Sequence, residues 1–289
     1  MVLPEDLASL VHSMGIERKS RTEELRLRRG FPMTAILEDR EEELDGRPVT
    51  ENELRCVLEN ATRASAHTAL DQVKNGFVTV RGGHRIGLCG TAACRDGKII
   101  TLRYLTSLSI RIACPVEGQA GQILPQLMEG GSMKSTLILA PPGAGKTTLL
   151  RELVRLLSDG IGCCPCRVGV ADERGELAAL WQGEPQFDLG RHTDVIDGCS
   201  KAEGLSILLR GMNPQVLAAD EITDAADVRA ITEASGCGAV LLATAHGNEV
   251  EDLSRRPVYR ALLESGVFCR VVLLSRQGAE RRTRVEVLP

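Results

Sequence analysis

The sequence predicts an α/β fold: a larger C-terminal domain with a mostly parallel sheet flanked by helices, preceded by a smaller α+β domain. Two observations support this prediction. From Ile123 onward, short apolar runs alternate with helical patterns, which is typical of parallel strands covered by helices. One of these runs leads into a glycine-rich loop that ends in Lys-Thr-Thr. The length of 289 residues and the apolar fraction of 43% suit two domains with packed cores.

The smaller domain is predicted to span residues 1–115. Its helices and strands follow from apolar periodicity, and Thr50 has the character of a helix N-cap because acidic residues follow it. We expect one helix over residues 4–14 and a second of about 20 residues that begins at Thr50. Strands are expected over 23–29, 31–37, 76–80 and 107–113, with another near 82–87. Residues 39–47 are expected to form a charged loop or hairpin. Residues 115–121, rich in Pro and Gly, form the best candidate for a linker.

The larger domain is predicted to span residues 116–289. Its buried strands are expected where four-residue or five-residue apolar runs contain β-branched side chains. These runs cover 137–140, 168–171, 216–219 and 239–243, with helices over 147–157, 202–211 and 224–235 between them, and a closing pair of strands over 268–275 and 283–288.

Residues 137–150 have the pattern of a phosphate-binding P-loop, with Ala140 where the first glycine usually stands. Glycines in the loop let successive backbone N–H groups point at phosphate oxygens, and the following helix adds its positive end. Lys146 is expected to reach the β and γ phosphates, and the Thr147 hydroxyl to bind Mg²⁺. The residues predicted to contact a nucleotide are Pro142, Gly143, Ala144, Gly145, Lys146, Thr147 and Thr148.

Acidic residues follow two of the other predicted strands. Asp220 and Glu221 come after four apolar residues, as in a Walker B element, and Asp172 and Glu173 end the strand before it. Because ligands of parallel sheets gather at the carboxyl ends of strands, we expect Asp220 to hold Mg²⁺ through water. Glu221 and Glu173 are both candidates for the general base that activates water, and the sequence does not choose between them.

A third strand is followed by Thr244 and His246, in the position of a sensor for the γ-phosphate. Arg191 and Arg210 are predicted near an edge of the sheet. Either arginine could neutralise charge in the transition state, within the chain or from a neighbouring subunit. Surface ion pairs are the alternative for both.

The composition excludes several classes of function. The net charge is −4 and the aromatic residues are four Phe, two Tyr and one Trp, so no nucleic-acid partner is expected. No apolar run approaches about 18 residues, and the N-terminus does not resemble a secretory signal. The ten cysteines therefore fit reduced thiols in the cytoplasm. Cys163, Cys164 and Cys166 form either a soft-metal site or a cysteine-rich loop.

Several motifs in order resemble the stage III sporulation protein AA family. They span about residues 20–275 and include 82–87, 109–113, 170–174, 191–204, 209–222 and 243–247. That family is similar to the ATPases of type II and type IV secretion. The resemblance implies a RecA-like domain that hydrolyses ATP with Mg²⁺, with Asp172 and Glu173 in an Asp box and His246 in a His box. It also implies that Arg191 and Arg210 line the nucleotide site, and that Arg85 and Arg111 approach it from the first domain.

The resemblance also implies a cellular setting. The chain would form a ring, as a hexamer, on the cytoplasmic face of a membrane on the mother-cell side. Its partners would be integral membrane proteins of the channel between mother cell and forespore. The sequence departs from the pattern at Thr223, where glycine is expected. A nucleic-acid-dependent RecA-like ATPase and a scaffold that binds nucleotide without hydrolysis are the alternative functions.

Overall fold

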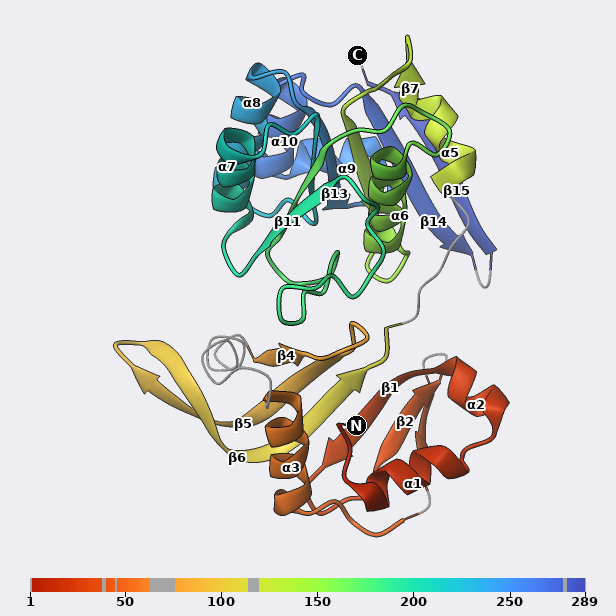
Figure 1. Ribbon diagram of the computed structural model, residues 1–289, viewed down its shortest axis with the longest axis vertical. Coiled ribbons are helices and arrows are strands. Elements are labelled where there is room, and N and C mark those ends of the chain that lie inside the picture. The colour runs from red at the N-terminus through yellow and green to blue at the C-terminus, as the bar shows by residue number, and fades with distance from the viewer. Residues whose placement is uncertain are drawn as a thin grey trace. The chain divides into compact units, whose positions relative to one another are not determined.

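The computed structural model describes residues 2–37, 40–44, 46–62, 76–113, 120–277 and 280–288. Its contacts divide the chain into two units, shown with their elements in Figure 1. The first unit holds Met1–Cys114 together with a later segment, Leu180–Gln186, and the second holds Pro115–Ala179 and Phe187–Pro289. Within the first unit, the side-chain Oε1 of Gln186 accepts a hydrogen bond from the backbone N–H of Gly82 at 2.8 Å.

The first unit is built on a six-stranded antiparallel sheet in the order β3-β2-β1-β6-β5-β4. Its core includes the fully buried Leu27, Met33 and Leu54. As predicted, Thr50 caps a helix, because its Oγ1 accepts from the N–H of Glu53 at 3.3 Å. The elements are α1 (Glu5–Ser13), α2 (Ile16–Arg21), β1 (Thr22–Arg28), β2 (Thr34–Leu37), β3 (Arg40–Glu43), α3 (Glu51–Thr62), β4 (Phe77–Thr79), β5 (Arg85–Arg95) and β6 (Lys98–Arg111).

The second unit is built on a seven-stranded sheet in the order β11-β10-β12-β13-β9-β14-β15. Six strands are parallel, and β15 pairs antiparallel with β14. The α/β prediction is therefore confirmed. The strands are β9 (Thr136–Ala140), β10 (Val168–Asp172), β11 (Thr193–Asp197), β12 (Val216–Ala219), β13 (Val240–His246), β14 (Arg270–Gln277) and β15 (Glu280–Val287).

Helices cover both faces of this sheet, as Figure 1 shows. On one face α7 (Lys201–Gly211), α8 (Ala225–Gly236) and α10 (Pro257–Glu264) enclose an apolar core that includes Leu208, Ile231 and Leu262. On the other face lie α5 (Ala120–Leu127) and α6 (Lys146–Asp159). Because both faces are covered, every residue of β9, β10 and β12 is buried, which explains their continuous apolar sequences. The remaining elements are α9 (Val250–Arg255) and a small hairpin of β7 (Met128–Glu129) and β8 (Ser132–Met133).

Some sequence predictions differ from the structure or fall outside it. The predicted linker, 115–121, lies outside the described residues except for its last two, which begin α5. The predicted charged loop or hairpin, 39–47, forms β3 in part, and residues 39 and 45 are outside the described residues. The helix expected from Thr50 is described as far as Thr62. Among the described residues, no helix is both long and apolar enough to cross a membrane.

Candidate functional site at the carboxyl edge of the parallel sheet

The P-loop connects the end of β9 to the start of α6. Gly143 and Gly145 have φ angles of +73° and +96°, a region that glycine occupies without strain. Ala140 is the fully buried last residue of β9 and does not have a positive φ, so alanine suits this position. A Cβ atom on Gly143 would meet nothing within 4 Å, so the loop is open there to a bound group.

Lys146 is buried, with 7% of the residue exposed, and it directly follows this loop. It donates to the carbonyl oxygens of Ala140 and Pro141, both at 3.3 Å, and lies 3.0 Å from Nδ1 of His246. Burial lowers the pKa of Lys146, and the nearby carboxylates of Asp220, Glu221 and Glu176 oppose that shift. Lys146 begins α6 after the loop that follows β9, and His246 ends β13, the strand that pairs with β9.

Asp220 accepts two hydroxyl hydrogen bonds just after β12. The Thr147 Oγ1 donates to its Oδ2 at 2.8 Å, and the Thr244 Oγ1 donates to its Oδ1 at 2.6 Å. Because β13 lies between β9 and β12, Thr244 on β13 lies between the P-loop after β9 and Asp220 after β12. Hydroxyl and carboxylate oxygens are ligands that Mg²⁺ prefers, so Thr147 and Asp220 fit a magnesium site.

Glu221 is joined to both sides of the site. Its Oε1 lies 2.9 Å from Nε2 of His246, and its Oε2 lies 3.0 Å from Nη1 of Arg174. The side chains therefore form a continuous chain from Lys146 through His246 and Glu221 to Arg174. The backbone of Glu221 is unusual, with a φ of +40°, and its N–H donates to Thr244 Oγ1 at 2.8 Å.

Asp172 organises the loop that follows β10. The residue is 1% exposed, and its carboxylate accepts from the backbone N–H groups of Glu176, Leu177 and Ala178 at 2.8–3.1 Å. Burial raises the pKa of Asp172, while the N–H donors act in the opposite direction. From α6, Arg151 donates to the carbonyl oxygens of Glu176 and Leu177 at 2.7 and 2.9 Å. The loop is thus held by both Asp172 and Arg151, and it positions Arg174 beside Glu221.

Glu173, the other candidate base, lies in a different ion pair. Its Oε2 is 2.5 Å from Nζ of Lys201, the first residue of α7. The structure thus brings together Lys146, Thr147, Asp220, Glu221 and His246, and holds Glu173 with Lys201. Thr148 lies in the first turn of α6, beside Thr147.

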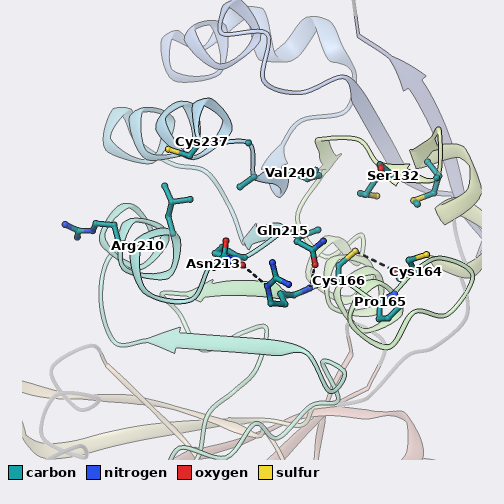
Figure 2. Close-up of a pocket in the computed structure, with 18 of the residues that line it drawn as sticks. Ser132, Cys164, Pro165, Cys166, Arg210, Asn213, Gln215, Cys237 and Val240 are labelled. Carbon is teal, nitrogen blue, oxygen red and sulfur yellow. Dashed lines mark hydrogen bonds between the residues drawn. The ribbon is translucent and has the colours of Figure 1, made fainter.

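The two predicted arginines lie at the opposite edge of the sheet. The N–H of Arg191 donates to Asp159 Oδ1 at 2.9 Å, and Asp159 ends α6, about 20 Å along that helix from Lys146. Arg210, near the end of α7, lines a pocket of about 720 Å³ with Asn213 and Gln215 (Figure 2). Neither arginine joins the cluster within one chain, so action from a neighbouring subunit stays a prediction for both.

The cysteine-rich loop opens onto the same pocket, where Figure 2 shows Cys164 and Cys166. Across the described part of the chain, no three or more His, Cys, Asp or Glu side chains are grouped so as to hold a metal ion. The metal interpretation of Cys163, Cys164 and Cys166 is therefore not supported. Arg85 and Arg111 lie in the first unit, where Arg85 stacks on the Phe77 ring at 3.6 Å and Arg111 pairs with Glu24 at 3.5 Å.

Sequence reasoning missed three residues of the site region: Arg151, Arg174 and Lys201. Arg174 directly follows Glu173, but its partner Glu221 is 47 residues away. Lys201 follows a helix N-cap, Ser200, which gives no sign that its ammonium would be buried. A lysine at the start of a helix is the one available signal, since a cation is unfavourable at the positive end of the helix dipole.

The parallel sheet covered by helices and the glycine-rich loop after β9 are those of a RecA-like P-loop fold. The chain belongs to the family "Sporulation stage III, protein AA", whose model matches residues 2–285. It is similar to Stage III sporulation protein AA of Bacillus subtilis, with 38% identity over 282 residues, covering 95% of this chain and 89% of that relative.

Solved structures share the fold. The pilus retraction motor PilT, solved with bound ADP, has a TM-score of 0.64 at 17% identity and covers 98% of this chain and 82% of its own. The ATPase DotB of Legionella pneumophila has a TM-score of 0.59 at 16% identity, covering 96% of this chain and 79% of its own. At this level of identity the likeness concerns the fold, and it confirms the RecA-like prediction.

Proposed function

We propose that this chain is a Mg²⁺-dependent ATPase of the secretion type, which hydrolyses ATP to ADP and phosphate. One observation carries the proposal: the P-loop pair Lys146 and Thr147 is hydrogen-bonded to the tips of β12 and β13 through Asp220 and His246. Such a cluster offers a cation, hydroxyls and a carboxylate base around the open P-loop. Bound Mg²⁺, held by Thr147 and through water by Asp220, would neutralise charge on the phosphate oxygens.

Each side chain has a role in this proposal. Lys146 donates to phosphate oxygens in place of the carbonyls of Ala140 and Pro141, together with the N–H groups of the P-loop. Glu221 accepts a proton from the attacking water, because its carboxylate contacts His246 beside Lys146, whereas that of Glu173 contacts Lys201 away from the P-loop. His246 contacts both Lys146 and Glu221, so it can report phosphate binding at Lys146 to the base.

The cellular role follows from the family. We propose a homo-oligomeric ring, as a hexamer, which lies against the mother-cell side of a membrane and drives assembly or transport by a channel complex during endospore formation. The partners would be integral membrane proteins of that complex. Support comes from the sporulation family and from the fold of PilT and DotB. Arg191 and Arg210 lie away from their own P-loop, as arginines that act on a neighbouring subunit would.

The first test is Mg²⁺-ATP hydrolysis as a function of protein concentration. We expect activity to rise faster than linearly as subunits assemble. Lys146→Ala should lower it at least about 100-fold, because it removes a donor that stabilises charge in the transition state. Lys134→Ala is the matched control. Lys134 pairs with Glu129 just before β9 begins, at the end of that strand away from the P-loop.

Two outcomes would contradict the proposal. ATP binding without turnover at any concentration, with or without membrane partners, would favour a scaffold. Hydrolysis that requires added DNA or RNA would favour a nucleic-acid-dependent ATPase.

A further inference from the structure

Lys201 is a buried charge that the proposed reaction does not use. Its side chain is 4% exposed at the first position of α7, where the helix dipole disfavours a cation. Burying an ammonium group is costly unless carboxylates compensate it. Two carboxylates do so here: Glu173 Oε2 lies 2.5 Å from Lys201 Nζ, and Asp227 Oδ2 lies 3.7 Å from it. These partners come from separate elements, the loop after β10 and the first turn of α8.

Asp227 links Lys201 to the loop that carries Glu221. Its Oδ2 accepts from the backbone N–H of Thr223 at 2.9 Å and from that of Asp224 at 3.4 Å. The Thr223 hydroxyl donates to the same oxygen at 3.4 Å. Thr223, where the family resemblance led us to expect glycine, therefore has a use for its side chain. The ion pair with Lys201 therefore fixes the Asp227 carboxylate, which in turn holds the backbone of this loop.

The packing of α7 explains how Lys201 reaches this position. Gly204 lies one turn after Lys201, and a Cβ atom there would meet Ile196 Cγ2 at 3.1 Å and Ala171 Cβ at 3.2 Å. The absence of a side chain lets α7 approach β10 and β11 closely. The start of the helix is thereby brought beside the end of β10, where Glu173 follows Asp172.

We infer that Lys201 is a positioning residue of the ATPase site: it fixes Glu173 and, through Asp227, sets the loop from which Glu221 extends toward His246. This inference rests on the proposed function for its effect on turnover. In this inference Glu173 positions the residues around the site, and Glu221 remains the general base. Lys201 itself touches neither the P-loop nor His246 in any of the contacts described above.

The test compares the parent with Lys201→Gln, Lys201→Arg and Glu173→Gln, with Lys134→Gln as the matched surface lysine. In Lys201→Gln we expect kcat to fall about tenfold or more, while KM and the Kd for a fluorescent ATP analogue change less than twofold. Lys201→Arg should restore most of kcat, because the guanidinium retains the charge. Glu173→Gln should lower kcat by a similar factor. Because this variant keeps the Lys201–Asp227 ion pair, it still tests the inference if Lys201→Gln fails to fold.

A second readout does not depend on turnover. Amide hydrogen exchange at Thr223 and Asp224 should quicken at least tenfold in Lys201→Gln and stay unchanged in Lys134→Gln. Unchanged exchange in folded Lys201→Gln, or a kcat equal to that of the parent, would overturn the inference. A parent that hydrolyses no ATP would instead refute the proposed function, and the exchange rates would still decide whether Lys201 holds the loop.

Discussion

At the scale of single residues, Glu221 stands out by its backbone. A φ of +40° in a residue other than glycine costs about 1–3 kcal/mol, so the surrounding structure must hold it. Here the N–H of Glu221 is tied to Asp220 Oδ1 at 3.0 Å and to Thr244 Oγ1 at 2.8 Å. The strained backbone turns the Glu221 side chain back toward β13, where His246 meets it. Strain at this position therefore supports a functional role.

The substitution Glu221→Gln tests that role. The amide keeps the shape of the side chain but accepts no proton, so we expect hydrolysis to fall about 10²–10⁴-fold. Affinity for ATP should change less than twofold, because Glu221 is not part of the P-loop. Single-turnover hydrolysis and equilibrium binding of a fluorescent ATP analogue measure the two effects. A larger loss of hydrolysis in Glu173→Gln than in Glu221→Gln would make Glu173 the base instead.

The thiols of Cys163 and Cys166 offer a test by pH. Burial, the largest cause, and the neighbouring cysteines raise the pKa of both groups. A raised pKa means a smaller thiolate fraction at a given pH, and the thiolate is the form that reacts. Their alkylation should therefore set in at higher pH than that of an unperturbed cysteine. Iodoacetamide labelling between about pH 7 and 10, mapped by mass spectrometry, measures this. Equal or faster labelling than at the exposed Cys94 would contradict it.

At the scale of elements, the buried strands and the longer helices of the second unit were predictable, and its partly buried strand β11 and its short helices were not. The runs at 137–140, 168–171 and 216–219 became β9, β10 and β12 because sheet residues covered on both faces must be apolar. The strand β11 escaped prediction, since its residues are only partly buried and include Asp194 and Asp197. The helices α9 and α10 have six and eight residues, too few to give a clear period.

The close approach of α7 to the sheet predicts an effect on stability. Gly204→Leu should lower the free energy of unfolding by about 1–3 kcal/mol, because Ile196 and Ala171 leave no room for a side chain. Gly211→Leu is the matched control on the same helix, as nothing lies within 4 Å of its Cβ position. It should be neutral or stabilising by up to about 1 kcal/mol, since leucine favours helix more than glycine does. Urea denaturation of both variants measures the difference. Equal destabilisation of the two variants would mean that the close contacts with Ile196 and Ala171 do not decide the effect at Gly204.

At the scale of the whole molecule, the parallel sheet explains how much of the site could be foreseen. Strands that run the same way deliver their carboxyl ends to one edge, so Lys146, Asp220 and His246 could be grouped from their positions after apolar runs. The ion pairs that these residues form with more distant side chains could not be predicted in this way. Glu221 meets Arg174 across 47 residues and Glu173 meets Lys201 across 28, and no periodicity encodes such distances. Arg191 and Arg210 come before β11 and β12, at the amino edge of the sheet, so within one chain they lie apart from these carboxyl ends.

The segment Leu180–Gln186 has a consequence for how this protein can be taken apart or recombined. The chain passes from one unit to the other after Cys114, after Ala179 and after Gln186. Cleavage near residue 115 alone would leave a piece of the first unit attached to the second. An exchange of the first unit between relatives must therefore carry two stretches of chain, and the shorter one begins seven residues after Glu173. Any replacement of the first unit therefore also changes a stretch of chain that follows closely after Arg174.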